Sequence, residues 1–84
     1  MNKNIFSIAE NQQLTLKFTS KDKTIAARKY ISMLEERYSI YYFNITVKKN
    51  NIKFTVPAIL VEEILQELLW NNFEFSLISR VVPV

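Results

Sequence analysis

The chain has 84 residues, of which 49% are hydrophobic and 23% charged, and its formal net charge is +3. A chain of this length buries roughly 60 to 65% of its unfolded surface, which is enough for one two-layer core and too little for a deep cleft between domains. The sequence therefore predicts a single domain over residues 1–84 with shallow binding sites. The mild basic excess is compatible with an anionic partner.

Three residue types that carry much of protein chemistry are missing, because the chain contains no histidine, no cysteine and no glycine. Without histidine and cysteine it lacks the usual general base near neutral pH, the commonest metal ligand and any thiol or disulfide. Glycine-rich phosphate loops and dinucleotide fingerprints are excluded as well. We expect no enzymatic activity, no cofactor and no metal. With no disulfide to form and no apolar run near the roughly 20 residues of a spanning helix, we also expect a cytoplasmic protein without a membrane partner.

The first predicted element is a half-buried strand, in which Leu14, Leu16 and Phe18 alternate with polar residues. A helix then follows over residues 21–39, because its apolar residues recur at helical spacing. Ser20 or Asp22 is the expected N-cap, since both side chains accept hydrogen bonds from unpaired helix N–H groups.

A β-hairpin comes next, formed by two runs of alternating apolar residues at 41–47 and 52–56. Asn50 and Asn51 suit its turn. In a chain without glycine, we expect asparagine to adopt the positive φ angles that turns require, here and again at Asn71 and Asn72.

A second helix begins at Pro57 and runs through Leu69, and a last strand starts at Phe73. The order is thus strand, helix, strand, strand, helix, strand. With right-handed crossovers this order predicts an α+β ferredoxin-like βαββαβ sandwich, with an antiparallel sheet in the order 4-1-3-2 and two helices on one face. Residues 1–10 fit the pattern least well and form either an extra edge strand or an arm.

The second helix has more apolar surface than one sheet contact needs, because its apolar residues cover an arc of roughly 180°. Leu65 and Leu69 belong to this arc, while Ile59 and Trp70 fall among the glutamates on the far side. A tryptophan there either anchors a protein interface or folds over the end of the sheet.

The predicted second strand gives an independent indication of a partner. Residues 40–43, which include Ile40 and Tyr42, are apolar on both faces of a strand that should be a sheet edge. Unprotected edges pair with another strand, so this edge either binds a partner, including a second copy of the chain, or is covered by the N-terminal arm. The last strand is expected to be protected by Arg80 and Pro83.

Basic residues are predicted to gather in two places. The start of the first helix and the hairpin turn lie at one end of this fold and bring together Lys21, Lys23, Lys48 and Lys49. They form either an anion or nucleic-acid contact or a set of solvated turn lysines. The open face of the sheet is expected to add Lys17, Lys53 and Arg80.

Aromatic and acidic residues are given structural roles. Phe18, Phe43 and Phe54 share the period of the core residues and should point inward, which leaves Tyr42 as the aromatic on the open face. Glu63 and Glu67 lie four residues apart and either hold a hard cation or, as we expect, form the solvated side of the helix.

One stretch resembles a known family. Residues 54–57 (Phe-Thr-Val-Pro), a helix with Glu62 and Glu63, and a following strand are similar to the strand, Val-Pro, helix, strand signature of the small phycobilisome linker polypeptides. The similarity covers about a third of the chain. Those linkers have paired glycines where this sequence has Asn71 and Asn72, and they lack the long hairpin. The resemblance implies an assembly-linker role.

These patterns together indicate a small non-enzymatic protein-protein interaction module: an inhibitor, adaptor or assembly factor of a larger complex. Its surface would be the outer part of the second helix and the second-strand edge, with a homodimer as one arrangement. The lysine- and asparagine-rich composition is typical of AT-rich genomes and of phage or other mobile elements. The alternative is a nucleic-acid-binding protein that uses the basic end and the open sheet face.

Overall fold

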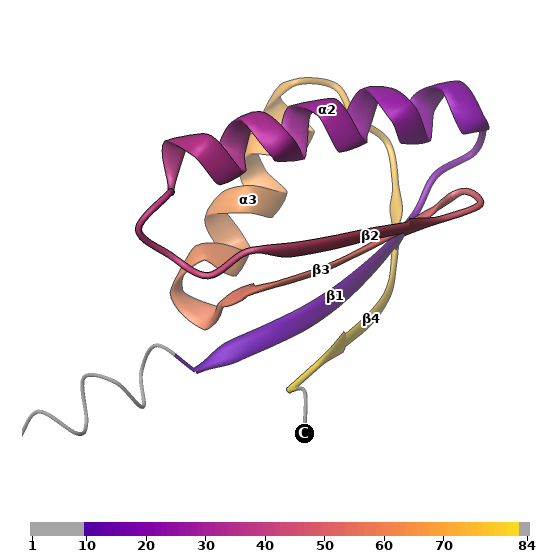
Figure 1. Ribbon diagram of the computed structural model, residues 1–84. Coiled ribbons are helices and arrows are strands. Elements are labelled where there is room, and N and C mark those ends of the chain that lie inside the picture. The colour runs from indigo at the N-terminus through magenta and orange to yellow at the C-terminus, as the bar shows by residue number, and fades with distance from the viewer. Residues whose placement is uncertain (1–9, 83–84) are drawn as a thin grey trace, which may run out of the picture.

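The structure is a computed structural model and describes residues 10–82. Apart from Glu10, the segment interpreted as an extra strand or arm lies outside these residues, as does Pro83. The described chain forms four strands and two helices (Figure 1). Their bounds are β1 Asn11–Lys17, α2 Lys21–Arg37, β2 Asn44–Lys48, β3 Asn51–Pro57, α3 Ala58–Trp70 and β4 Ser76–Val81.

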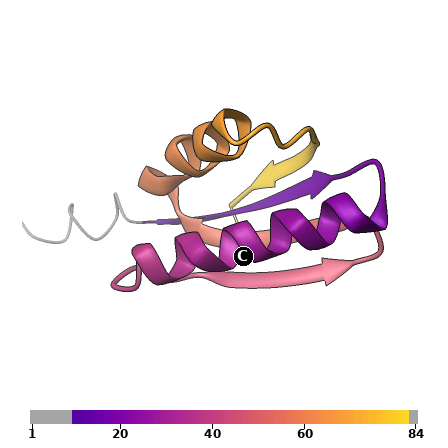
Figure 2. The ribbon, with the colours of Figure 1, turned by 90° about the horizontal axis from the view of Figure 1, so that it is seen from above.

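The sheet is antiparallel and has the order β2-β3-β1-β4, which confirms the predicted ferredoxin-like βαββαβ fold. Both helices lie on one face of the sheet (Figure 1). Seen from above, α2 runs along the side of the sheet that contains β2, and α3 lies on the side that contains β4 (Figure 2). The opposite face of the sheet is not covered by either helix.

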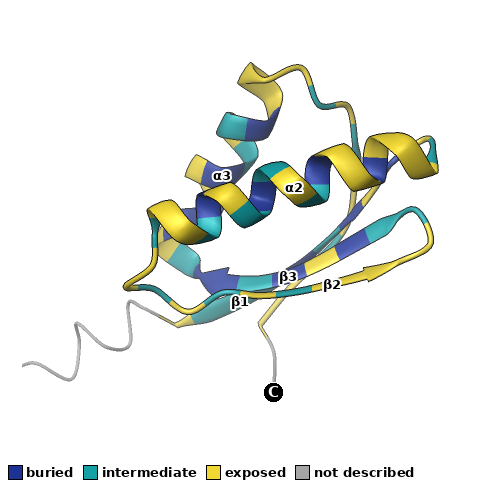
Figure 3. Cartoon of the chain, turned by 45° about the horizontal axis from the view of Figure 1, so that its top comes forward, coloured by how far each residue is buried: buried dark blue, intermediate teal, exposed yellow. Residues whose placement is uncertain are grey.

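The core lies between the helices and the two central strands. Alternate residues of β1 and β3 are completely buried beneath the helices, as the dark blue segments of Figure 3 show. These strand residues are Leu14, Leu16, Ile52, Phe54 and Val56. Each helix contributes four buried residues. Those of α2 are spaced by three or four, and those of α3 are an adjacent pair followed at intervals of three and four, so each helix has one apolar stripe facing the sheet. Phe18 and Phe54 point into this core, as the sequence predicted, and Phe43 packs against it.

The helix starts and turns match the predictions in part. Ser20 caps α2, because its hydroxyl accepts a hydrogen bond from the Lys23 backbone N–H at 3.2 Å. Pro57 ends β3 and immediately precedes α3 rather than occupying its first turn. A positive φ occurs at Asn72, as expected, but in the hairpin it falls on Lys49 and not on an asparagine.

The prediction for the second strand was wrong at its start. β2 begins at Asn44, so Ile40 and Tyr42 lie in the connection that leads from α2 to the strand. Tyr41 and Phe43 turn inward and pack against the core, which holds this segment to the body of the domain. The two-sided apolar run therefore anchors a loop and does not form the edge of the sheet.

The predicted side-chain orientation in the last strand was wrong for Arg80. The β1–β4 register shifts between Thr15 and Leu16, because Leu77 pairs with Leu16 whereas Ser79 pairs with Thr15. Ile78 is the extra residue of this bulge, and an extra residue reverses the alternation beyond it. Arg80 consequently pairs with Leu14 and lies on the helix-covered side rather than on the open face.

Candidate functional site

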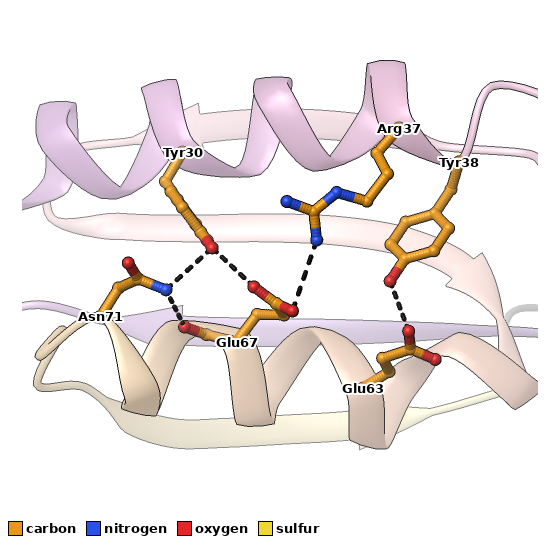
Figure 4. A network of polar contacts seen from close by, with 6 residues as sticks. All are labelled: Tyr30, Arg37, Tyr38, Glu63, Glu67 and Asn71. Carbon is orange, nitrogen blue, oxygen red and sulfur yellow. Dashed lines mark hydrogen bonds and ion pairs between the residues drawn. The ribbon is translucent and has the colours of Figure 1, made fainter.

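The contact between the two helices contains glutamates that the sequence placed in solvent. Tyr30 of α2 donates its hydroxyl to Glu67 Oε1 at 2.6 Å, and Tyr38 donates to Glu63 Oε2 at 2.5 Å (Figure 4). Arg37 Nη1 lies 3.3 Å from Glu67 Oε2. The interpretation as a solvated face holds for Glu63, which is exposed, and is wrong for Glu67, whose side chain is 20% exposed; both residues also join α3 to α2.

These contacts also shift the ionisation of the tyrosines. The hydrogen bond to Glu67, with burial adding to it, raises the pKa of Tyr30 above its usual value. The bond to Glu63 likewise raises the pKa of Tyr38. Both shifts arise because the protonated hydroxyl is the donor to a carboxylate. The shifts belong to a contact that holds the two helices together.

The outer surface of α3 has the exposed apolar residues that the sequence predicted. Trp70 is 69% exposed, and Ile59 and Leu69 are each more than half exposed. Leu65 is half-buried against the core. The tryptophan does not fold over the end of the sheet in a buried position, so this helix presents large apolar side chains to solvent.

The edge of the sheet at β4 is apolar, which the sequence pattern did not predict. Four large residues at or next to this strand are roughly half exposed: Leu77, Ile78, Val81 and Val82. Among residues 10–82, β4 pairs with β1 alone, so its other side is an edge of the described sheet. Glu62 of α3 contacts Arg80 of β4, and Leu65 and Leu69 follow Glu62 at helical spacing on the same side of α3. We call the set of Leu65, Leu69, Leu77, Ile78, Val81 and Val82 the β4–α3 surface. It spans both faces of the sheet edge, because Leu77 pairs with Leu16 on the helix side and Val81 pairs with Gln13 on the open side.

One pair of opposite charges lies beside this surface. Arg80 Nη1 lies 2.9 Å from Glu62 Oε2, and Arg80 Nε donates to Gln12 Oε1 at 2.7 Å. Arg80 therefore bridges β1, β4 and α3. The bulge in β4 turns this arginine toward the helix, and it thereby removes Arg80 from the predicted anion-binding set.

The edge at β2 differs in composition. Asn44, Thr46 and Lys48 are exposed, and Val47 is the one large apolar residue of this strand with more than a third of its surface exposed. Ile40, at 87% exposure, and Tyr42, at 51%, precede the strand and lie in the loop. The predicted partner residues thus fall into two separate groups, one on α3 and one in the α2–β2 loop.

The basic end has the predicted arrangement. The Phe18 N–H donates to Asn50 O at 2.8 Å, which ties the β1–α2 connection to the hairpin turn. Lys21 and Lys23 at the start of α2 thus share one end of the molecule with Lys48 and Lys49, and both segments meet at one side in Figure 2. Ser20 already satisfies one N–H of this helix start. Whether these lysines bind an anion stays a prediction.

The open face contains a hollow. A shallow trough of about 300 Å³ is lined by Thr15, Thr46, Lys48, Asn51 and Lys53. These residues come from β1, β2 and β3, and Lys17 lies beside them because it pairs with Asn51. Lys17, Lys48 and Lys53 therefore do share the open face, as predicted.

Within residues 10–82, no cluster of three or more acidic side chains is arranged to hold a metal ion. Neither helix in the same range has the length and apolarity needed to cross a membrane. Comparisons with known proteins found no matching family model, no similar curated protein and no similar solved structure. The resemblance to the phycobilisome linkers stays a pattern over a third of the chain.

Proposed function

We propose that this chain is a small non-enzymatic protein-interaction module, that the β4–α3 surface is its contact surface, and that its first partner is a second copy of the chain. The observation that carries the proposal is the exposure of five large apolar residues on and beside one sheet edge: Leu69, Leu77, Ile78, Val81 and Val82. Apolar side chains gathered at an unpaired edge are typical of a place where another strand adds.

Pairing through this edge would extend the sheet. Two β4 strands placed antiparallel across a twofold axis form an isologous contact, in which each copy offers the same residues. Backbone hydrogen bonds then supply part of the affinity, and side chains on alternate positions supply the rest. The bulge at Ile78 interrupts regular pairing, so the backbone contact is expected beyond it, with Leu77 and Leu69 adding apolar area.

The charges near this edge support a second copy as the occupant. Arg80 and Glu62 neutralise each other within one chain, so two copies meet here without like-charge repulsion. The open face, by contrast, presents Lys17, Lys48 and Lys53, and two such faces would repel. The β4–α3 surface is therefore better suited to self-association than the face beside it.

A module of this size with a further exposed helix surface suits an adaptor, inhibitor or assembly factor of a larger complex. Ile59 and Trp70 lie on the outer side of α3 and would remain accessible in the β4 dimer. We assign them to a second contact, with the larger partner. A cytoplasmic setting suits a chain that contains no cysteine to be oxidised.

The test is the molar mass in solution. We expect the wild-type chain to have about twice its 10.0 kDa at about 200 μM and to approach the monomer mass on dilution. The double variant Leu77→Lys/Val81→Lys should be monomeric, because charged side chains at an edge oppose strand addition. Light scattering coupled to size-exclusion chromatography measures both.

Val47→Lys is the matched control, because Val47 faces the helix side of the other sheet edge and is 42% exposed, against 46% for Leu77. It should leave the dimer intact. A wild-type chain that stays monomeric at the highest concentration would overturn the proposal. Loss of the dimer in Val47→Lys, with the β4 variant still dimeric, would move the contact to β2 and overturn it too.

A further inference from the structure

The trough on the open face has the chemical character of an anion site. Three of its five lining residues offer uncharged polar groups, namely Thr15, Thr46 and Asn51, and two are lysines. Cross-strand pairing sets Thr15 opposite Lys53 and Lys53 opposite Thr46, so that each lysine has a polar and uncharged neighbour. Hydroxyl and amide groups that flank ammonium groups are the donors that bind phosphate oxygens.

The positive charge of this face is uncompensated. The pairing places the following strand residues of β1, β2 and β3 on the open side: Gln13, Thr15, Lys17, Asn44, Thr46, Lys48, Asn51, Lys53 and Thr55. None of them is acidic. Within residues 10–82, neither of the two ion pairs involves Lys17, Lys48 or Lys53. An anion placed in the trough would therefore meet three lysines from three neighbouring strands and no carboxylate among these strand positions.

The other end of the same face is polar and has one exposed aromatic ring. The row beyond the trough consists of Gln13, Thr55 and Asn44, which pair across the three strands. Asn44 Nδ2 donates to the Tyr42 hydroxyl at 3.2 Å, so Tyr42 lies next to this row. A lysine-rich groove beside a polar row and an exposed tyrosine can bind single-stranded nucleic acid, with phosphates in the groove and a base stacked on the ring.

We propose that the trough binds phosphate groups of single-stranded nucleic acid, with Lys48 and Lys53 on the phosphates, Lys17 beside them and Tyr42 stacking on one base. This binding does not depend on the proposed dimer. The trough involves β1, β2 and β3, whereas the dimer contact lies on β4 and α3. Extending the sheet through β4 would place two such faces side by side.

The experiment is fluorescence anisotropy with a labelled oligothymidylate of about 12 nucleotides at about 50 mM salt. We expect saturable binding that weakens with added salt. Lys48→Gln/Lys53→Gln should raise the Kd by about 10-fold or more. It should also reduce the salt dependence of binding, because a protein that contacts fewer phosphates releases fewer counterions. Tyr42→Ala should raise it by about 5-fold or more through lost stacking.

The matched control is Lys21→Gln/Lys23→Gln, which removes the same charge from the basic end outside the trough. It should raise the Kd by less than about 3-fold. Equal weakening by the two double variants would mean attraction by net charge alone and would overturn the proposal, as would undetectable binding at low salt. Thr46→Glu, a single exposed change within the trough, should abolish binding while circular dichroism stays unchanged, which separates loss of the site from loss of the fold.

Free phosphate compounds are a second source of the same chemistry. ATP and inorganic phosphate are titrated by isothermal calorimetry against the wild type and Lys48→Gln/Lys53→Gln. We expect both to bind far more weakly than the oligonucleotide, because each engages one region of the trough. ATP binding that depends on these lysines, with no oligonucleotide binding, would overturn the proposal that the bound phosphates belong to nucleic acid. The dimer mass of the trough variants should not change in any of these outcomes.

Discussion

The two outer strands of the sheet, β2 and β4, differ in what they present to solvent. β2 has exposed Asn44, Thr46 and Lys48 along its length, whereas β4 and the residue after it expose Leu77, Ile78, Val81 and Val82. Polar and lysine side chains protect an edge from pairing, and exposed apolar ones favour it. The difference favours β4, and not β2, as the edge that pairs with a strand of a partner.

The largest expected effect tests whether the apolar residues of β4 belong to the core. Phe54 is fully buried, so Phe54→Ala should lower the free energy of unfolding by about 3 to 5 kcal/mol. Leu77→Ala, in a strand residue that also faces the helices, should cost less than about 1 kcal/mol in the monomer. Chemical denaturation at low concentration measures both. Similar losses in the two variants would show that Leu77 supports the fold and is not held free for a partner.

The next effect compares the edges directly through single substitutions. Ile78→Lys should raise the dimer dissociation constant by about 10- to 100-fold, since a buried contact loses an apolar side chain and gains a charge. Val47→Lys should change it by less than about 2-fold. Sedimentation equilibrium over a dilution series gives both constants. Equal effects of the two substitutions would remove the distinction between the edges.

A smaller effect concerns the contact between α2, which lies on the β2 side of the molecule, and α3, which lies on the β4 side. Tyr30→Phe removes a hydrogen bond to Glu67 and should cost about 1 kcal/mol of unfolding free energy. Dimer formation through β4 should be unchanged in this variant, because the core is unchanged. Thermal melts with a dimer-mass measurement check both parts, and a lost dimer would mean that the helix contact controls the β4 edge.

The same link predicts a pH dependence in the alkaline range. Because the folded-state pKa values of Tyr30 and Tyr38 are raised above the usual 10.0, their contribution is fully present below pH 10 and is lost as the pH rises through the raised values. The melting temperature of the wild type should fall more steeply above pH 10 than that of Tyr30→Phe/Tyr38→Phe. Parallel curves for the two proteins would contradict this assignment.

The smallest expected effect is that of the ion pair at the β4 edge. Glu62 is largely exposed, so Arg80→Met should change the unfolding free energy by less than about 1 kcal/mol. Its effect on the dimer dissociation constant should be small as well, because the Arg80–Glu62 pair avoids like-charge repulsion between the copies and adds no attraction between them. A loss of association comparable to that of Ile78→Lys, seen in the same sedimentation assay, would show that the charges hold the interface.

The fold was predictable from the sequence because the spacing of the apolar residues and the order of the elements define it. Alternation in β1 and β3, helical spacing in α2 and α3, and the order of the elements were sufficient for the topology, and Ser20 was recognisable as a cap by its residue type. These are local signals that the final packing reinforces. The exposed residues Ile59, Leu69 and Trp70 followed from the same helical projection.

The features that were missed depend on tertiary contacts. The bulge at Ile78 reverses the facing of Arg80, and nothing in a run of alternating residues marks where an extra residue enters. Glu63 and Glu67 read as a solvated pair because their partners, Tyr38 and Tyr30, come from the other helix. Ile40 and Tyr42 read as strand because Tyr41 and Phe43 alternate with them.

The central claim is that β4 is the edge where two copies meet, and the absence of cysteine allows a direct test. Single-cysteine variants Ser79→Cys and Val81→Cys, treated with a short thiol cross-linker, should give a covalent dimer of about twice 10.0 kDa, because paired antiparallel strands lie about 5 Å apart. Thr46→Cys should stay monomeric, since the two β2 strands of such a dimer would be about 34 Å apart. Cross-linking at Thr46 without cross-linking at either β4 position would contradict the account.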